Sequence, residues 1–335
     1  RVATHLGTEH TELYVTPAEA RAVIPTLPDV YDEPFADSSQ IPTCLVSRLA
    51  RRRVTVALSG DGGDELFGGY VRYAAADAVW RKASKVPVPV RRGVAAFVGA
   101  MWPEPVDAWA ADALGALGWL RGRIGRRVRL RRLAGVLRFR DFGELYEDFM
   151  VHWKEGLVVG ARGGRAEAYR EGGGWPDRWA AMAAMDLGAY LPDDLLVKVD
   201  RASMAVGLEV RAPFLDPRVV EWALGLPRSL KLRKGLSKWV LRRVVYRHVP
   251  REWVDRPKMG FGVPMGEWLR GPLRDWAESL LQPRRLEGEG FLRPAPVWRL
   301  WLRHLDGRVD GHLPLWAVLM FQAWLEREAG SGRSG

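Results

Sequence analysis

The densest group of residues that could carry chemistry follows a short apolar run, in the segment Ser59-Gly-Asp-Gly-Gly-Asp-Glu-Leu-Phe-Gly-Gly-Tyr70. Glycines let a backbone turn sharply and approach a ligand closely, while Asp61 and Asp64 place carboxylates in the same turn. A glycine-rich loop between a strand and a helix N-terminus favours an anionic ligand such as a phosphate. The carboxylates would repel a bare phosphate, so we expect a divalent cation to bridge them.

Commoner ligand-binding motifs do not fit this segment. The spacing Gly60-x-Gly62-x-x-Glu65 lacks the third glycine of a dinucleotide fingerprint, and no Gly-Lys-Ser/Thr follows to make a Walker loop. An acidic, N-capped turn would explain Asp64 and Glu65 alone, but not Asp61 and the glycines around it. The six histidines show no spacing typical of zinc ligands, so no zinc site is expected.

A second candidate is the segment Asp255-Arg-Pro-Lys-Met-Gly-Phe-Gly-Val-Pro264. Its prolines and glycines exclude a continuous helix and suit a loop that closes over a site. Lys258 would supply a movable positive charge to phosphate oxygens there. The alternative is an ordinary solvated lysine.

Two further polar groups are weaker candidates for substrate contact. One is a loop that precedes a helix, and its polar residues are Asp37, Ser38 and Ser39. The other is a helical face that carries Asp194, Lys198 and Arg201. On that face an ion-pair ladder is as well supported as ligand contact.

The elements before this loop read as alternating helix and strand. Residues 1–6 predict the end of a helix stopped by Gly7, and residues 10–16 predict a strand from their alternating apolar pattern. Thr16-Pro17-Ala18-Glu19 predicts a helix start with an N-cap, a proline in the first turn and a capping glutamate.

The fold class expected from this order is α/β followed by a large, mostly helical region. Residues 54–58 are β-branched and apolar, which predicts a buried parallel strand. Two strands are too few for a doubly wound sheet, so we expect further strands upstream of Arg1. The predicted domains are residues 1–80, the end of the α/β part, and residues 81–335, the helical region.

Three segments together resemble the asparagine synthetase (glutamine-hydrolysing) family. Ser59–Tyr70 resembles its second nucleotide-binding signature. Leu191–Met204, continuing to Glu209–Asp216, and the segment Asp255–Pro264 agree with later motifs in the family's order. The resemblance runs from near Arg1 to about Arg270.

The resemblance implies an ATP-pyrophosphatase-type synthetase domain on an adenine-nucleotide alpha-hydrolase-like parallel sheet. Such domains convert the side-chain carboxylate of aspartate to an acyl-adenylate, release pyrophosphate and add ammonia derived from glutamine. It implies ATP and Mg²⁺, with the loop at residues 255–264 returning to the active site. It implies small-molecule substrates rather than nucleic acid, and leaves a homodimer open.

The resemblance also assigns roles by position. Ser59 and Gly60 would contact the nucleotide, and Asp64 would hold Mg²⁺ through the pyrophosphate. Asp61 would lie beside the acyl-adenylate or accept a proton from ammonia; better-known members carry a glutamate there, one methylene longer. Lys258 would contact the phosphates. Asp37, Ser38, Ser39 and Lys198 would approach the substrate.

The chain departs from the family in two segments. The upstream Ser-Gly-Gly-x-Asp-Ser loop that cradles ATP is absent, as is an N-terminal amidotransferase domain. We therefore expect these 335 residues to be part of a longer polypeptide and to be inactive alone. The change at Asp61 leaves open a relative that amidates or cyclises another carboxylate, such as a sugar acid or an antibiotic precursor.

Charge and composition limit which other classes of function are possible. The net charge is +11 and 43 of 51 basic residues are arginines. Nine of them lie between residues 121 and 140, a pattern that fits a solvated basic helix and, less well, an RNA-binding module. The single cysteine, Cys44, and the absence of any long apolar run indicate a cytoplasmic protein without a membrane segment.

Overall fold

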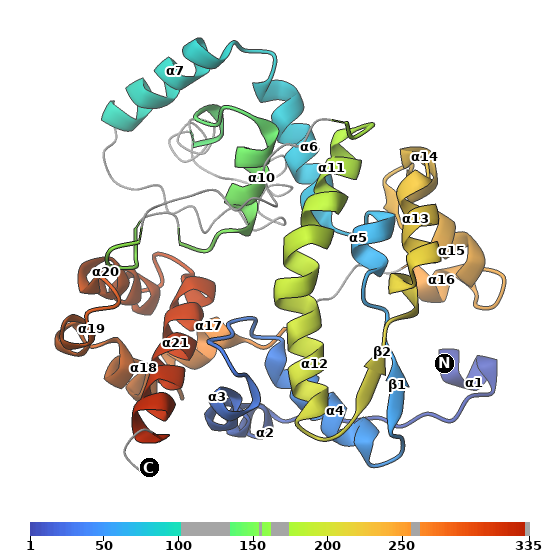
Figure 1. Ribbon diagram of the computed structural model, residues 1–335, viewed down its shortest axis with the longest axis horizontal. Helices are drawn as coiled ribbons and strands as arrows, with labels where there is room; N and C mark the ends of the chain where they lie inside the picture. Colours follow the sequence, from blue (N-terminus) through green and yellow to red (C-terminus); the bar gives the residue numbers. More distant parts are fainter. Residues whose placement is uncertain (102–134, 154–155, 162–173, 256–261, 332–335) are drawn as a thin grey trace. The chain divides into compact units, whose positions relative to one another are not determined.

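The computed structural model describes residues 1–101, 135–153, 156–161, 174–255 and 262–331. The chain is mostly helical, with a small parallel sheet, and forms two compact units (Figure 1). Unit 1 comprises Arg1–Gly69, Leu187–Leu280 and Leu315–Gly335, and unit 2 comprises Tyr70–Asp186 and Leu281–Pro314. The domain boundary at residue 80 stays a prediction.

Unit 1 contains the described strands and most of the short helices. Its elements up to residue 69 are α1 (Val2–Leu6), α2 (Pro17–Ala22), η1 (Ile24–Thr26), α3 (Leu27–Val30), α4 (Gln40–Arg51), β1 (Val56–Leu58) and α5 (Gly63–Phe67). The next are η4 (Asp186–Leu196), α12 (Val197–Met204), β2 (Glu209–Arg211), η5 (Pro213–Leu215), α13 (Pro217–Gly225), α14 (Arg228–Lys231), β3 (Leu232–Arg233) and β4 (Leu236–Ser237). The last are α15 (Trp239–Val245), α16 (Arg251–Val254), α17 (Met265–Arg270), α18 (Arg274–Leu281) and α21 (His312–Ser331). Of these, α18 and α21 extend into unit 2 by one and three residues.

The predicted strand at residues 54–58 is confirmed as β1, and its pairing with β2 is parallel. The register places Val56 opposite Glu209 and Leu58 opposite Arg211. The prediction that this strand is buried was wrong, because Leu58 is 75% exposed. Parallel strands are buried when other elements cover both faces, and in the described part of the chain this sheet consists of β1 and β2.

Of the remaining predictions for the N-terminal residues, two are confirmed and one was wrong. α1 ends at Gly7 with a left-handed φ of 65°, and Thr16 and Glu19 form the predicted capping box at α2. Residues 10–16 are not a strand, and Tyr14 is 84% exposed. Alternation alone does not make a strand, because its backbone groups also need a hydrogen-bonding partner strand.

A small apolar core holds the glycine-rich segment in place. Leu66 and Phe67 of α5 and Ala223 of α13 are fully or nearly fully buried. Partly buried side chains from η4, η5, α13, the residue after α13 and α15 pack around them: Leu187, Phe214, Val220, Leu226, Val240 and Leu241. The short helix α5 is therefore fixed by tertiary packing rather than by its own five residues.

The helical run before β2 positions another group of polar residues. It begins with the π-helical segment η4, which contains Pro192, and continues as α12. α12 packs against α4 and β2. Residues on α12 and on the loop before α4 are thereby brought together although far apart in sequence.

The described part of unit 2 is mostly helical and has an aromatic core. Its described helices are α6 (Val71–Ala83), α7 (Val88–Met101), α10 (Phe142–Met150), α11 (Arg178–Met185), α19 (Pro283–Glu289) and α20 (Pro294–Leu305). α10 and α11 both pack on α6. There Tyr73 lies edge-on to Tyr146 and Trp179, with ring centroids 6.1 and 5.6 Å away.

A buried polar cluster lies within this aromatic core. The carboxylate of Asp186 accepts hydrogen bonds from Arg72 Nη2 at 2.6 Å, the Tyr73 hydroxyl at 2.7 Å and the Tyr146 hydroxyl at 2.8 Å. Burial raises the pKa of Asp186 above its ordinary value, although the Arg72 guanidinium opposes this shift. Three donors on one fully buried carboxylate indicate a structural role.

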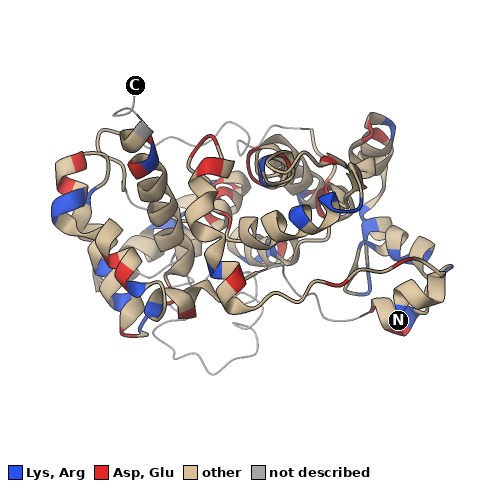
Figure 2. Cartoon of the chain, turned by 90° about the horizontal axis from the view of Figure 1, so that it is seen from below, with Lys and Arg blue, Asp and Glu red and all other residues tan. Residues whose placement is uncertain are grey.

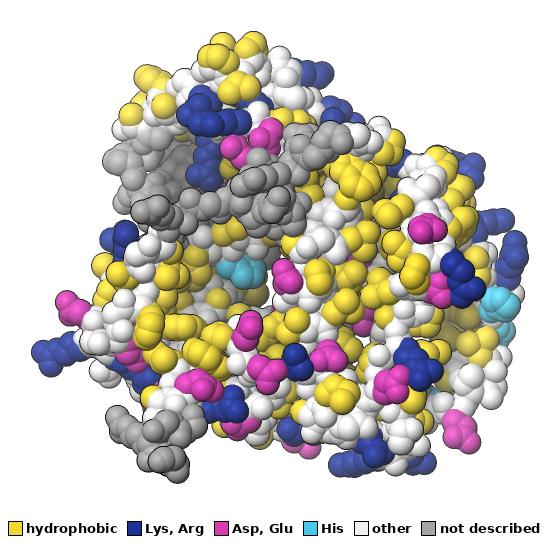
Figure 3. Space-filling model, viewed as in Figure 1, with side chains coloured by type: hydrophobic (Ala, Val, Ile, Leu, Met, Phe, Trp, Pro, Cys, Tyr) yellow, Lys and Arg dark blue, Asp and Glu magenta, His cyan; other side chains and the backbone are white. Residues whose placement is uncertain are grey.

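The described surface mixes charged and apolar side chains. Basic and acidic residues are interspersed along the helices (Figure 2), while Val90, Val94, Phe97 and Met101 are exposed on α7, which carries hydrophobic side chains at the top of Figure 3. Most of the arginine-rich run at 121–140 lies outside the described residues. In the described part, no helix combines the length and apolar content needed to cross a membrane.

Candidate functional site

The predicted loop begins where β1 ends, and its first residues contact one another. The backbone N–H of Ser59 donates to the carbonyl of Arg211 at 2.8 Å, which extends the pairing with β2 by one residue. The Ser59 hydroxyl donates to Asp61 Oδ2, also at 2.8 Å. Both residues are half-buried and Gly60 between them is exposed. The structure thus places a hydroxyl, a carboxylate and an open backbone at the carboxyl end of the strand.

Glycine is required in this loop because other segments approach its backbone. Gly62 has a left-handed φ of 85°, and a Cβ there would lie 2.4 Å from Leu215 Cδ2. At Gly63 a Cβ would lie 3.3 Å from the ring of Phe214. The loop is therefore packed tightly against η5, which belongs to a motif far along the chain.

Asp64 lies in the first turn of α5, which follows the loop, and is paired with a lysine. Its Oδ1 lies 3.1 Å from Lys238 Nζ, and both side chains are partly exposed. A Cβ at Gly69 would lie only 1.8 Å from the same Oδ1. The carboxylate therefore lies directly over the backbone of Gly69, in space that any other residue would fill.

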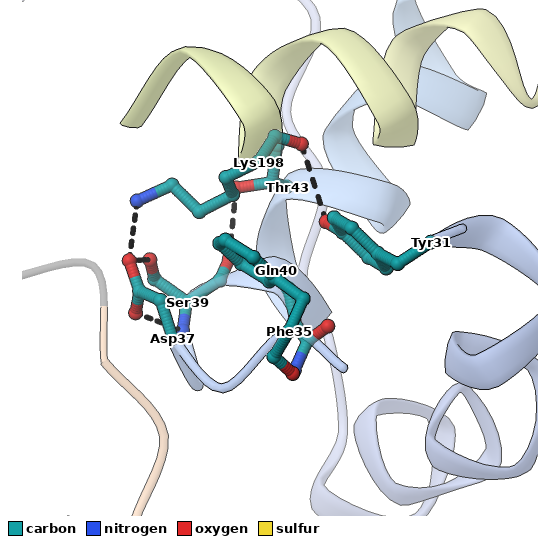
Figure 4. Close-up of polar contacts among 7 residues, drawn as sticks. All are labelled: Tyr31, Phe35, Asp37, Ser39, Gln40, Thr43 and Lys198. Atoms are coloured by element: carbon teal, nitrogen blue, oxygen red, sulfur yellow. Dashed lines mark hydrogen bonds and ion pairs between the residues drawn. The ribbon is translucent and has the colours of Figure 1, made fainter. Parts of the chain in front are cut away.

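The predicted substrate residues form a second cluster, shown in Figure 4. Lys198 Nζ lies 2.5 Å from Asp37 Oδ2. Ser39 donates to the same carboxylate through its backbone N–H at 2.9 Å and its hydroxyl at 2.8 Å. The Tyr31 hydroxyl donates to the carbonyl of Lys198 at 3.2 Å. Ser38 is half-buried, and its carbonyl accepts from the N–H of Ile41 at 3.3 Å.

Electrostatics keep Asp37 ionised. Burial alone would raise its pKa, but the Lys198 ammonium and the two donors of Ser39 outweigh burial and hold the pKa below its ordinary value. The Asp37 side chain remains 23% exposed and that of Lys198 10% exposed. The pair is thus charged and still reachable by a small polar ligand.

The predicted site residues therefore occupy two clusters of unit 1. One cluster follows β1 and consists of Ser59, Gly60 and Asp61 on the loop and Asp64 in α5. The other consists of Asp37, Ser39 and Lys198, between α12 and the start of α4. Arg201 pairs with Asp32 at 3.2 Å. Lys258 lies outside the described residues.

Sequence reasoning missed Lys238. It is one of two non-glycine residues with a left-handed backbone in the described chain, a conformation that no local motif predicted. Only the fold reveals that it faces Asp64, which lies on a different motif.

The donor set can be tested against the expected magnesium ion. In the described residues, no group of three or more histidine, cysteine, aspartate or glutamate side chains could hold a metal by itself. Magnesium is usually bound by one or two carboxylates together with phosphate oxygens and water. Asp64, a carboxylate fixed over the backbone of Gly69, fits that kind of shared site.

Comparison with known proteins gives a consistent result. The family model described as Asparagine synthase matches residues 1–326. A Mycobacterium tuberculosis protein provisionally named as a glutamine-hydrolysing asparagine synthetase is 34% identical over 323 residues, which are 96% of this chain and 47% of that protein. Asparagine synthetase (glutamine-hydrolysing) 1 of Bacillus subtilis is 29% identical over 329 residues, 96% of this chain and 48% of its own length. The chain spans about half the length of the curated relatives it matches.

Proposed function

The chain belongs to the asparagine synthase family, and on that premise we propose that it is the synthetase part of an enzyme that amidates aspartate with ATP and Mg²⁺. The observation that carries the proposal is the segment after β1, where Ser59 and Asp61 on the loop and Asp64 in the first turn of α5 follow the carboxyl end of a parallel strand. Ligands of open α/β sheets bind at this edge. The finer fold that we propose for this part is an adenine-nucleotide alpha-hydrolase-like sheet.

The proposed reaction has two steps. An oxygen of the aspartate side chain attacks the α-phosphorus of ATP, the bond to the leaving oxygen breaks, and pyrophosphate departs from an acyl-adenylate. Ammonia then attacks the acyl carbon and AMP leaves, which gives asparagine.

The loop residues support these steps by binding and by proton transfer. We infer that the exposed backbone at Gly60 and the hydroxyl of Ser59 contact the nucleotide. Asp61, held by Ser59, would accept a proton from the attacking ammonia. Asp64 would hold Mg²⁺, which supplies charge neutralisation to the phosphates when bound. Lys258 would add a positive charge to them.

The Asp37–Lys198 pair is proposed to bind the amino-acid end of the substrate. A free amino acid carries an ammonium and an α-carboxylate, and the pair offers one group of opposite charge to each. Because Ser39 already fixes the Asp37 carboxylate, little ordering is needed when the substrate arrives.

The remaining elements of the proposal concern the whole protein. Since the chain covers about half of its curated relatives, we propose that glutamine hydrolysis and an upstream ATP-binding loop belong to segments outside these residues. The 335 residues alone would then synthesise nothing. We further propose a cytoplasmic enzyme and leave a homodimer open.

Pyrophosphate release tests the function and its alternative. The polypeptide that contains this chain should release pyrophosphate when given ATP, Mg²⁺, ammonia and aspartate. Other carboxylates, such as sugar acids, should neither replace aspartate nor compete with it. Faster release with another carboxylate would favour the alternative of a related amidotransferase or cyclase, for which the shorter side chain at Asp61 is the reason.

A further inference from the structure

Lys238 supplies a cation to the carboxylate that we assign to magnesium. The distance from its Nζ to Asp64 Oδ1 is 3.1 Å, and the side chains of Lys238 and Asp64 are 32% and 26% exposed. The pair is sheltered more than an ordinary surface ion pair, yet water and small ions reach it. It is therefore able to exchange partners.

The backbone of Lys238 is held in a conformation unfavourable for a residue with a side chain. Its φ is 54° and its ψ 35°, in the left-handed region that suits glycine. Lys234 shares this conformation, but it lies in the two-residue turn between β3 and β4, beside Gly235 with φ of 80°, where hairpins require positive φ. Lys238 precedes α15 and has no such turn to explain it.

Tertiary contacts fix Lys238 in this conformation. Its N–H donates to the carbonyl of Phe67 at the end of α5, at 3.2 Å. The two apolar residues that follow in α15, Val240 and Leu241, pack in the core cluster around Leu66 and Phe67. Strained conformations persist only where the surroundings demand them, so the fold directs this side chain to Asp64.

Gly69 lies directly against the side chains of the same ion pair. A Cβ at this position would lie 1.8 Å from Asp64 Oδ1 and 2.3 Å from Lys238 Cε. Its φ is not in the left-handed region, so a larger residue there would be opposed by space and would displace these two side chains. Three features, an ion pair, a strained backbone and a glycine against which both side chains lie, therefore meet at one contact.

We propose that Lys238 is a positioning residue that holds the Asp64 carboxylate before substrate binds and moves onto phosphate oxygens when a divalent cation takes its place. This inference rests on the proposed function. A cation and an ammonium compete for the same carboxylate oxygen, and they repel one another. A lysine has three donors on a flexible stem and can follow the phosphate instead.

The exchange has a consequence for binding. Lys238 opposes a divalent cation that arrives alone, because its ammonium must leave the carboxylate without a new partner. It favours a cation that arrives with pyrophosphate, because the phosphate receives the ammonium. Lys238 thereby selects the metal–phosphate complex over the free metal ion.

The experiment measures Mn²⁺ binding to the polypeptide that contains this chain by electron paramagnetic resonance, with and without pyrophosphate. In Lys238→Gln, Mn²⁺ alone should bind roughly threefold more tightly, since a partly exposed ion pair no longer competes. Mn²⁺ with pyrophosphate should bind roughly tenfold more weakly, since a charged hydrogen bond to phosphate is lost. Lys234→Gln, on the exposed hairpin turn, should change neither affinity.

A second variant distinguishes the proposed exchange from a general disturbance of the structure. Gly69→Ala displaces Asp64 and Lys238 together and should weaken both kinds of binding. Gly225→Ala is its control, because no heavy atom lies within 4 Å of a Cβ there. A loss of folding would lower both affinities in Lys238→Gln, whereas the proposal requires changes of opposite sign.

Each outcome is decisive. If both affinities of Lys238→Gln shift in one direction, or neither shifts, the exchange is wrong. The metal site of the proposed function then survives provided that Asp64→Asn abolishes the binding of Mn²⁺ with pyrophosphate. If the unaltered polypeptide that contains this chain binds no Mn²⁺ with pyrophosphate, both the site and the exchange are overturned.

Discussion

Two carboxylates of this chain, Asp37 in unit 1 and Asp186 in unit 2, are each mostly or fully buried and paired with a basic side chain. Asp37 faces Lys198 and its pKa is lowered, whereas Asp186 faces Arg72 and its pKa is raised. The same two effects, burial and an opposite charge, act at both sites. At Asp186 burial is complete and prevails; at Asp37 the carboxylate is 23% exposed and the charge prevails.

The difference distinguishes a carboxylate that stabilises the fold from one that a ligand can reach. Asp186 is saturated by Arg72 and two tyrosine hydroxyls inside the core of unit 2, so a ligand has no access to it. The Asp37–Lys198 pair is charged, ordered by Ser39 and reachable. A charged pair is a candidate for substrate binding only when it keeps an open side, and the following changes test that distinction.

Removal of the Asp186 carboxylate should have the largest effect on stability. Asp186→Ala leaves the Arg72 guanidinium and the hydroxyls of Tyr73 and Tyr146 without their acceptor, which costs about 3–5 kcal/mol in the free energy of unfolding. Urea denaturation followed by circular dichroism measures it. Asp186→Asn retains an acceptor and should lose less. A loss below about 1 kcal/mol for the alanine variant would show that the cluster is not structural.

Removal of the cation at the other site should cost less. Lys198→Met leaves Asp37 with the donors of Ser39 and with water, so we expect a loss of about 1–3 kcal/mol. The control is Arg201→Met, which breaks an exposed pair with Asp32 and should change stability by at most about 1 kcal/mol. Equal losses from Lys198→Met and Asp186→Ala would remove the contrast between the sites.

Replacing one tyrosine at each site by phenylalanine removes a single hydroxyl and its hydrogen bond. The Tyr73 hydroxyl donates to a buried carboxylate, and Tyr73→Phe should cost about 1.5–3 kcal/mol. The Tyr31 hydroxyl donates to the neutral carbonyl of Lys198, and Tyr31→Phe should cost about 0.5–1.5 kcal/mol. The same denaturation assay ranks them. The reverse order would mean that the Asp37 site depends more on its polar contacts than the buried cluster does.

The two carboxylates should respond to pH with opposite signs. The lowered pKa of Asp37 gives a contribution to stability that is present above its unfolded pKa near 4 and lost as the pH falls through the folded value. The raised pKa of Asp186 gives a contribution that is present below that unfolded value and lost as the pH rises through the folded value.

Stability measured between about pH 3 and pH 7 separates these contributions. Asp37→Asn should reduce the loss of stability in acid relative to the unaltered chain. Asp186→Asn should instead remove a loss that accompanies rising pH. Each unit of pKa shift corresponds to about 1.4 kcal/mol. Changes of the same sign in both variants would contradict the assigned directions.

Local signals in the sequence predicted what local interactions determine. The capping box of Thr16 and Glu19 and the helix end at Gly7 depend on neighbouring residues, and both are confirmed. The strand before Ser59 is also confirmed, although its partner β2 lies far along the chain. The motifs also predicted the family, which the match over residues 1–326 confirms. The roles of the individual site residues stay predictions.

Long-range contacts could not be predicted in this way. The strand proposed at residues 10–16 has the right alternation but pairs with no strand among the residues that the structure describes. Lys198 reaches Asp37 across 161 positions of sequence, and Lys238 reaches Asp64 from another motif. No periodicity or cap records such pairs, because only the packing of α12 on α4 and of α15 on α5 creates them.

The most direct test of the proposed function is aspartate-dependent exchange of labelled pyrophosphate into ATP by the polypeptide that contains this chain. Exchange should require Mg²⁺ and aspartate, because it reverses the formation of the acyl-adenylate. Asp64→Asn should abolish it, and Lys234→Gln on the exposed hairpin turn should leave it unchanged. Undiminished exchange in Asp64→Asn, or exchange that needs no carboxylate substrate, would contradict the assignment of this loop.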